Sequence, residues 1–265
     1  MPTSSVSSAR LSEPSTHPAS DPSARPATSA PAPPARRCEN LVEASDEARI
    51  PPAPPGFSVR GVDASTPVPW KRISAEGFAF AILQASLGPR KNPSFEANWT
   101  MAGTCGLRRA AYHFLTPASD GKSQARTFLD TLGDDPGELL PIVDVERSPG
   151  CKSACCELSC GEWSELTASW LKEVEARLGV RPLVYTVEDF WKECLCNKSR
   201  FAKRDLWLAG YPRFDAAPRP GFGGWLKWAF YQHKGNVKIG KGVVDLNVFR
   251  GSPQELDRYA LRPAR

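Results

Sequence analysis

The chain has 265 residues, of which 41% are hydrophobic and 24% are charged, as in ordinary water-soluble globular proteins. The net charge of +5 is spread along the sequence without the clustered Lys and Arg of nucleic-acid-binding proteins, so we expect no nucleic-acid partner. No stretch reaches the roughly 18 consecutive apolar residues that a membrane-spanning helix requires, so we expect no membrane span.

The first 55 residues differ in composition from the rest of the chain. They are rich in Ser, Pro, Ala and Thr, contain few large apolar side chains, and end in Pro51-Pro52-Ala53-Pro54-Pro55. Such a segment cannot bury enough apolar surface to fold. We therefore predict a disordered low-complexity tail over residues 1–55 and a folded domain over residues 56–265. No apolar stretch typical of a secretory signal peptide is recognisable near the N-terminus.

Short apolar runs alternate with helical stretches after the tail. Predicted strands cover Val59–Ala64, Phe78–Ala85, Arg109–Leu115, Leu139–Glu146, Pro182–Thr186, Leu206–Tyr211, Trp228–Gln232 and Val243–Phe249. Several are almost continuously apolar, as in parallel sheets that helices cover. Apolar periodicity predicts helices over Ser123–Leu132 and Trp163–Leu178. Eight strands with interposed helices indicate an α/β fold, an irregular, TIM-like β/α barrel. The gaps between the last three strands are too short for full helices.

Four acidic residues lie in or at the ends of these strands, where β/α barrels carry their reactive groups. Asp63 ends the first strand, Asp144 and Glu146 end the fourth, and Asp245 lies near the start of the last. Residues i and i+2 of a strand point to the same face, about 6.6 Å apart along it, so Asp144 and Glu146 are predicted to be neighbours. Repulsion between two such carboxylates raises the pKa of one, which suits acid catalysis of glycoside cleavage. Alternatively, the acids serve only as helix caps or salt-bridge partners.

Aromatic side chains are frequent in and near the predicted strands. They offer flat apolar contact to the C–H faces of sugar rings, although core packing is the simpler interpretation for most of them. The residues are Tyr112, Tyr185, Tyr211, Trp225, Trp228 and Tyr231. We take Tyr112, Tyr185 and Tyr211 as candidate substrate-binding residues.

The eight cysteines indicate either disulfides or a zinc site. Four of them lie between Cys151 and Cys160, and two are Cys194 and Cys196. Their spacings do not match the C-x2-C pairs of zinc sites, which favours disulfides in an oxidising compartment. Because the two cysteine-rich segments follow consecutive strands, we predict at least one disulfide between them. Adjacent Cys155 and Cys156 are expected to pair with other partners, since vicinal geometry is strained.

The order of these segments resembles glycoside hydrolase family 25, the Chalaropsis-type lysozymes or N,O-diacetylmuramidases. The matching segments are Val59-Arg60-Gly61-Val62-Asp63, Trp70-Lys71-Arg72-Ile73, Gly77-Phe78-Ala79-Phe80-Ala81-Ile82, Ala110-Ala111-Tyr112-His113-Phe114, Leu140-Pro141-Ile142-Val143-Asp144-Val145-Glu146, Pro182-Leu183-Val184-Tyr185-Thr186, Leu206-Trp207-Leu208-Ala209-Gly210-Tyr211, Phe230-Tyr231-Gln232 and Val244-Asp245-Leu246-Asn247-Val248-Phe249. The match spans about residues 58 to 250.

The resemblance implies hydrolysis of bacterial peptidoglycan at the β-1,4 bond between N-acetylmuramic acid and N-acetylglucosamine. It implies that Glu146 is the general acid, that Asp144 positions or polarises the substrate's N-acetyl group, and that Asp63 and Asp245 complete the acidic floor. Tyr112 is expected to contact the reacting sugar, and Gln232 is taken as a further substrate-binding residue. We expect the protein to need neither a metal nor a cofactor. We also expect it to be monomeric and to be secreted or located in the cell envelope.

Two departures from the family pattern flank the expected cleft. Gln84-Ala85-Ser86-Leu87-Gly88 stands where the family usually has a K-A-T-E-G-like segment, and Thr66-Pro67-Val68-Pro69 replaces an element that often contains Gln-Gly. The cysteine-rich insertion after Glu146 is also unusual. An alternative to an active hydrolase is therefore a glycan-binding barrel with weak or no turnover, and another is a metal protein built on the cysteines.

Overall fold

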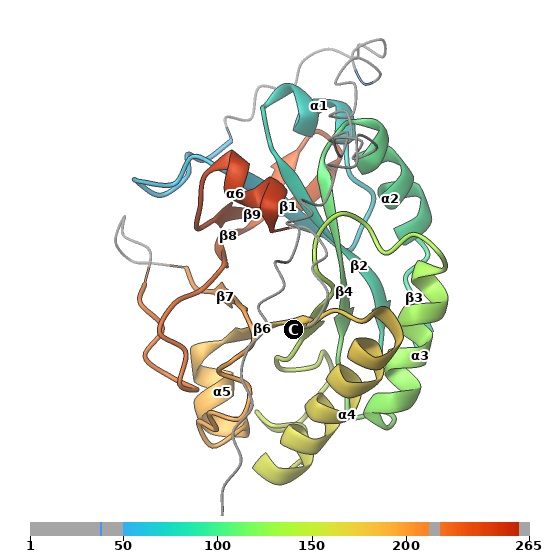
Figure 1. The fold of residues 1–265 in the computed structure, drawn as a ribbon, viewed down its shortest axis with the longest axis vertical. Coiled ribbons are helices and arrows are strands. Elements are labelled where there is room, and N and C mark those ends of the chain that lie inside the picture. Colours follow the sequence, from blue (N-terminus) through green and yellow to red (C-terminus); the bar gives the residue numbers. More distant parts are fainter. Residues whose placement is uncertain (1–37, 39–49, 212–217, 260–265) are drawn as a thin grey trace, which may run out of the picture. The chain divides into compact units, whose positions relative to one another are not determined.

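The computed structural model describes residue 38 and residues 50–211 and 218–259 (Figure 1). Eight strands form one closed barrel, in the order β1-β9-β8-β7-β6-β5-β4-β2 with β2 pairing back to β1. These strands are β1 (Arg60–Ala64), β2 (Phe80–Leu87), β4 (Arg108–Phe114), β5 (Ile142–Asp144), β6 (Leu183–Val187), β7 (Leu206–Ala209), β8 (Phe230–Ile239) and β9 (Gly242–Phe249). The short β3 (Arg90–Lys91) extends the sheet beside β2. The predicted irregular β/α barrel is confirmed, while the predicted tail lies almost entirely outside the described residues.

Strand β9 is the irregular element of the barrel. The pairs from β1–β2 round to β7–β8 are parallel, whereas β9 runs antiparallel to both β8 and β1. A short turn at Gly240 joins β8 to β9, and such a turn can connect only antiparallel strands. The start of β9 therefore lies at the end of the barrel where β1 finishes.

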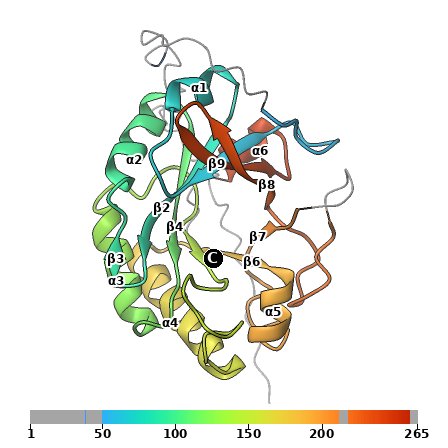
Figure 2. The ribbon, with the colours of Figure 1, turned by 180° about the vertical axis from the view of Figure 1, so that it is seen from behind.

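Helices cover the outside of the barrel. They are α1 (Trp70–Ala75), α2 (Phe95–Thr104), α3 (Gly121–Leu132), α4 (Cys160–Leu178), α5 (Glu188–Cys194) and α6 (Pro253–Arg258). Helices α2, α3 and α4 follow one another along one flank, as views from both sides show (Figures 1 and 2). The described residues between β7 and β8 contain no helix, in agreement with the short gaps seen in the sequence.

The two helices predicted from periodicity begin two or three residues earlier than the apolar pattern indicates, because polar caps precede it. The Asp120 side chain accepts a hydrogen bond from the backbone of Ser123 at the start of α3. At α4, Ser159 and Glu162 form a capping box, in which each side chain bonds the other's backbone. Gly179 ends α4 in the left-handed conformation with φ 67°.

Apolar side chains fill two separate layers. One cluster lies between the strands and the helices and includes Trp163, Trp170 and Trp191, all fully buried. The other fills the barrel and includes Phe80, Phe230 and Phe249, whose rings pack with centroids 5.1 Å apart. Gly61 is required here, because a Cβ at this position would lie 2.2 Å from the Phe80 ring. The packed interior gives the strand ends a rigid base.

Strands β5 and β8 differ most in length from their predictions. Strand β5 contains only Ile142–Asp144, since Pro141 has no N–H to donate to a ladder. Strand β8 continues to Ile239, seven residues beyond its predicted end, because Lys234, Asn236 and Lys238 are exposed on the hairpin and break the apolar pattern.

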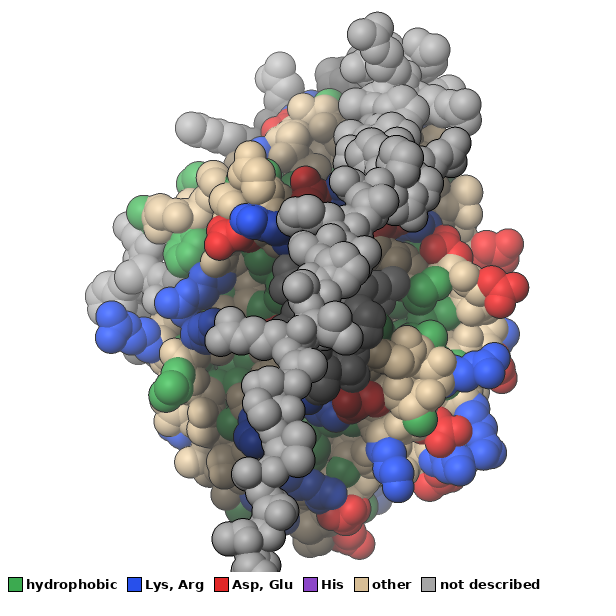
Figure 3. Space-filling view, viewed as in Figure 1, with side chains coloured by type: hydrophobic (Ala, Val, Ile, Leu, Met, Phe, Trp, Pro, Cys, Tyr) green, Lys and Arg blue, Asp and Glu red, His purple; other side chains and the backbone are tan. Residues whose placement is uncertain are grey.

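The described surface carries charges of both signs. On the face seen in Figure 3, basic and acidic side chains lie side by side, most clearly along its right edge. No helix among the described residues is both long and apolar enough to cross a membrane.

Candidate active site

Four carboxylates meet at one end of the barrel. Asp63 lies near the end of β1 and is the direct partner of Asp245 in the β1–β9 ladder. Asp144 is the last residue of β5, and Glu146 follows two residues later. The Val145 N–H, directly after Asp144, donates to the Tyr185 carbonyl at 2.9 Å. The structure therefore brings together all four acidic residues that the sequence singled out.

Asp144 is the most isolated of these groups. Its side chain is only 4% exposed, and its Oδ1 has no hydrogen-bond partner among the described residues. A buried polar atom without a partner is costly in a folded protein and is found preferentially at functional sites. Asp144 therefore has an oxygen available for a ligand or a proton.

Burial and mutual repulsion raise the pKa of every member of the cluster. Burial, and then the charges of Asp245 and Glu146, raise the pKa of Asp63 to about 8. The pKa of Glu146 rises to about 7 through burial and the nearby Asp245. Burial and the charges of Glu146 and Asp63 hold the pKa of Asp144 well above its usual range, and burial also raises the pKa of Asp245. The cluster therefore retains protons near neutral pH, as acid catalysis requires.

Gln232 on β8 joins two of the carboxylates. Its Nε2 donates to Asp63 Oδ2 at 2.9 Å and to Asp245 Oδ2 at 3.2 Å. Its Oε1 accepts hydrogen bonds from Tyr185 at 3.2 Å and from Tyr211 at 3.0 Å. The side chain is 3% exposed, so these contacts lie inside the barrel wall.

Asn247 and Trp207 complete this network, and neither was among the residues that the sequence singled out for the site. Asn247 Nδ2 donates to Asp63 Oδ2 at 2.6 Å, and Asn247 Oδ1 accepts from Trp207 Nε1 at 2.8 Å. Both lie in segments that resemble the family. The available signal was the strand alternation, which places Asn247 on the same face of β9 as Asp245.

The three candidate tyrosines surround the cluster. Tyr112 and Tyr185 are buried and pack against Trp207, with ring centroids 5.9 and 4.4 Å away. Tyr211 is 60% exposed, which leaves its ring accessible. Burial and the nearby acids raise the pKa of Tyr112 and Tyr185 well above 10, so both phenols are neutral.

The other three aromatics from the sequence are packing residues. Trp225 and Trp228 are buried and donate to the backbone carbonyls of Arg204 and Pro218. Tyr231 packs against Trp228 with ring centroids 5.4 Å apart and donates to the Gly210 carbonyl. The simpler interpretation of these three side chains, core packing, is confirmed.

Where the sequence departs from the family, neutral side chains stand at the edge of the site. Gln84 Oε1 accepts a hydrogen bond from Asn92 Nδ2 at 3.0 Å, and the same nitrogen donates to the Ser65 carbonyl at 2.8 Å. Leu87 packs against the apolar cluster inside the barrel. Asn92, which follows β3, thus ties β2 to the segment after β1.

Disulfides tie the loop after Glu146 to helix α5 and the residues that follow it. Bridges join Cys155 to Cys194 and Cys160 to Cys196, and a local bridge joins Cys151 to Cys156. A fourth bridge joins Cys38 to Cys105, so no cysteine is free. The predicted link between the two cysteine-rich segments is confirmed, Cys155 and Cys156 have different partners as predicted, and a zinc site on these cysteines is excluded.

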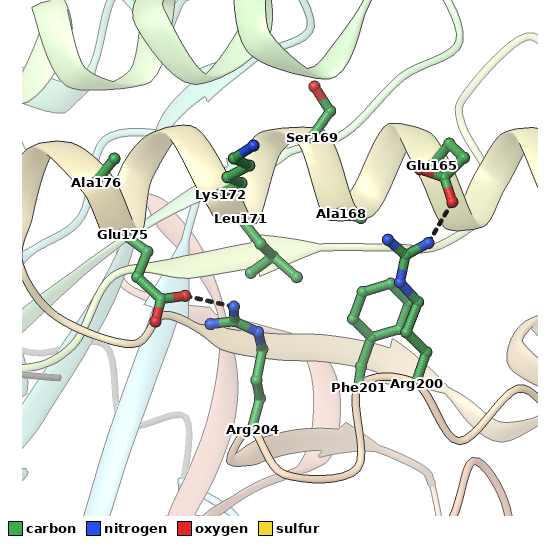
Figure 4. A pocket seen from close by; sticks show the side chains of 10 residues that line it. All are labelled: Glu165, Ala168, Ser169, Leu171, Lys172, Glu175, Ala176, Arg200, Phe201 and Arg204. Atoms are coloured by element: carbon green, nitrogen blue, oxygen red, sulfur yellow. Dashed lines mark hydrogen bonds and ion pairs between the residues drawn. The ribbon is translucent and has the colours of Figure 1, made fainter. Parts of the chain in front are cut away.

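A separate cavity of about 750 Å³ lies outside the barrel, between α4 and the segment 200–204 (Figure 4). Its two arginines are both paired. Arg204 bonds Glu175 at 2.5 Å, and Arg200 bonds Glu165. This cavity contains none of the four clustered carboxylates.

A β/α barrel with proton-retaining carboxylates and aromatic side chains at one end is the arrangement of a glycoside hydrolase. Comparison with known proteins agrees. The family model described as Glycosyl hydrolases family 25 matches residues 62–242. The chain belongs to this family and is a glycoside hydrolase.

The similarity extends to characterised relatives and solved structures. The chain is 31% identical to Lysozyme M1 from Streptomyces globisporus over 233 residues, covering 82% of this chain and 76% of that protein. It is 28% identical to an N,O-diacetylmuramidase from Arthroderma benhamiae, covering 77% of this chain and 86% of that protein. The structure of a family GH25 lysozyme from Aspergillus fumigatus superimposes with a TM-score of 0.69 at 28% identity, covering 77% of this chain and 99% of that one.

Proposed function

We propose that this protein is a peptidoglycan hydrolase of the lysozyme type, which cleaves the β-1,4 bond between N-acetylmuramic acid and N-acetylglucosamine. The names of the relatives, lysozyme and N,O-diacetylmuramidase, support this activity. The observation that carries the proposal is the pair at the end of β5, where buried Asp144 has an unpartnered oxygen and Glu146 titrates near neutral pH.

Glu146 is assigned the role of general acid. Its pKa of about 7 means that it holds a proton at neutral pH and releases it readily. The carboxyl donates this proton to the glycosidic oxygen while the bond from that oxygen to the anomeric carbon breaks. A water molecule then supplies the new hydroxyl at this carbon and returns a proton to the carboxylate.

Asp144 is assigned to the substrate's N-acetyl group. Its free Oδ1 has a lone pair for the amide N–H, and repulsion from Glu146 keeps the two groups from ionising together. Asp63 and Asp245 form the acidic floor opposite this pair. Tyr112 and Tyr185 lie beside the acids, and the exposed ring of Tyr211 is assigned to contact a sugar face.

The four disulfides support a secreted or cell-envelope location, because disulfides form and persist mainly in oxidising compartments. A monomer is expected, since one chain supplies all four carboxylates.

The test is digestion of purified bacterial cell walls, followed by chemical reduction of the newly formed sugar ends and mass spectrometry. A muramidase gives reduced N-acetylmuramic acid at the new ends, and the Glu146→Gln variant should give none above background. New ends carrying reduced N-acetylglucosamine would contradict the proposed bond. Binding to walls without release of any fragment would instead support the glycan-binding alternative.

A further inference from the structure

We infer that Gln232 is a positioning residue whose amide holds Asp63 and Asp245 as a matched pair, and that it does not bind the sugar. This inference rests on the proposed function, because it takes the Asp63–Asp245 pair to serve the proposed glycoside hydrolysis. It assigns to Gln232 a role other than the substrate contact expected from the sequence.

The hydrogen-bonding capacity of the Gln232 side chain is full. A carboxamide has two N–H groups and one oxygen with two lone pairs. The two N–H groups are directed at Asp63 Oδ2 and Asp245 Oδ2, and the oxygen accepts from the hydroxyls of Tyr185 and Tyr211. With four partners for four positions and 3% exposure, Gln232 has nothing left to offer a ligand.

The amide meets a need that the strand pairing creates. Asp63 and Asp245 are direct partners on adjacent antiparallel strands, so their side chains leave the same face about 5 Å apart. Like charges in this position repel each other. In the described part of the chain, no Lys or Arg forms an ion pair with any of the four clustered carboxylates. The Gln232 nitrogen, which contacts both acids, therefore stands where another site would place a cation.

The donors divide the cluster into two unlike pairs. Asp63 also accepts from Asn247 at 2.6 Å, and Asp245 also accepts from the backbone N–H of Asn236 at 2.7 Å. Hydrogen bonds to a carboxylate favour its ionised form. Asp144 Oδ1, by contrast, has no donor at all. The donors thus partly offset the rise in the pKa of Asp63 that burial causes, whereas Asp144 Oδ1 receives no such donor.

Two tyrosine hydroxyls fix the position of the Gln232 amide through its oxygen. Tyr185 packs on Trp207 with ring centroids 4.4 Å apart. The Tyr211 hydroxyl lies so close to Gly235 that a Cβ there would approach it to 2.8 Å. Both hydroxyls therefore reach Gln232 Oε1 from constrained rings. The other titratable groups that face the acid pair are Asp144, Glu146, Tyr112, Tyr185 and Tyr211, and none of them carries positive charge.

The experiment compares Gln232→Met, which removes both N–H donors at similar size, with Gln254→Met, the same change on the exposed face of α6. The pH dependence of kcat/KM is measured on a soluble peptidoglycan tetrasaccharide. We expect the acidic limb to move upward by about one pH unit in Gln232→Met, because the lost donors no longer favour ionisation, while KM stays within about twofold. Gln254→Met should match the wild type. A raised KM with an unmoved limb would show that Gln232 is a sugar ligand and overturn the inference.

A second measurement does not depend on catalysis. Carbon-13 NMR of labelled Asp and Glu carboxyls, assigned with Asp63→Asn and Asp245→Asn, follows each titration without substrate. In Gln232→Met the titrations of Asp63 and Asp245 should move upward together, whereas unchanged titrations would overturn the inference. If Gln232→Met does not fold, Gln232→Glu replaces it, and a fifth acid at this position should move both titrations further in the same direction. A protein without lytic activity whose titrations move as expected would contradict the proposed function but not the role of Gln232.

Discussion

The N–H of Val145 donates to the carbonyl of Tyr185, and this bond completes the pairing of Asp144 with Tyr185 at the end of the β5–β6 ladder. Glu146 lies one residue further along, and its charge acts on Asp144 within the same cluster. The backbone bond and the buried strand together fix the position of Asp144.

Glu146→Gln should abolish most of the activity. The substitution keeps the shape of the side chain and removes the transferable proton, and loss of a general acid costs on the order of 10² to 10⁴ in turnover. Release of reducing ends from cell walls measures the effect. Glu193→Gln, an exposed glutamate on α5, is the control and should behave as the wild type. Lysis by Glu146→Gln within about twofold of the wild type would contradict the assignment.

Stability should decrease between pH 6.5 and pH 8. Asp63 has a folded-state pKa of about 8 against an unfolded value of 3.8, so its contribution is complete below pH 4 and is lost as the pH rises through 8. Each proton that only the folded state retains changes the free energy of unfolding by about 1.4 kcal/mol per pH unit. Over this interval we expect a loss of about 2 kcal/mol in urea unfolding with the disulfides intact.

Two histidines, the buried His113 and the half-buried His233, act in the opposite direction but at lower pH. Burial lowers the pKa of His113 and His233 to about 4, so their contribution is present above pH 6.5 and is lost only as the pH falls. They do not mask the loss between pH 6.5 and 8. Asp63→Asn should make the decrease in this range smaller without removing it, because Glu146 also titrates there, and Asp134→Asn, an exposed control, should leave it unchanged. A wild-type protein that gains stability from pH 6.5 to 8 would show that the cluster does not retain its protons.

The sequence predicted the elements whose signal is local. All eight barrel strands and the two long helices produce runs or periodicities within a few residues, and Asp63 and Asp245 stand out as acids in apolar strands. The hydrogen bonds around Gln232 have no local signal. Asn247 and Asp63 are 184 residues apart in the chain and meet only because β9 closes the barrel against β1. The full coordination of Gln232 likewise depends on side chains from β1, β6 and β9 and on Tyr211, which follows β7.

The two long-range disulfides near Glu146 should stabilise the protein in a non-additive way. Cys155–Cys194 and Cys160–Cys196 span 39 and 36 residues and close nearly the same loop. If one bridge is replaced by serines, the other still links the two segments, so the unfolded chain gains only the freedom of a short loop. We expect this to lower the free energy of unfolding by about 2 kcal/mol. Replacing both also releases the long loop, for a total of about 6 kcal/mol.

Urea unfolding of the two single-bridge variants and the double-bridge variant checks this expectation. The local Cys151–Cys156 bridge, which spans five residues, is the matched control, and its removal should cost about 2 kcal/mol in any background. Equal and additive losses for the two long-range bridges would show that they constrain independent parts of the unfolded chain.

Removal of residues 1–37 should leave the melting temperature unchanged, whereas removal of residues 1–49 should lower it. The first 37 residues contain few large apolar side chains to contribute to a core. The longer deletion also removes Cys38, whose bridge to Cys105 spans 67 residues and contributes about 4 kcal/mol in the chain-entropy model. The full-length double variant Cys38→Ser, Cys105→Ser isolates the bridge and should reproduce most of the loss.

Residues from Ile50 onward are retained in both deletions, because Ile50, Ala53 and Phe57 pack against the core and Phe57 lies 5.1 Å from the Trp228 ring. A drop of roughly ten degrees on removal of residues 1–37 alone, about 2.5 to 5 kcal/mol for a domain of this size, would show that the segment before Cys38 contributes to the fold.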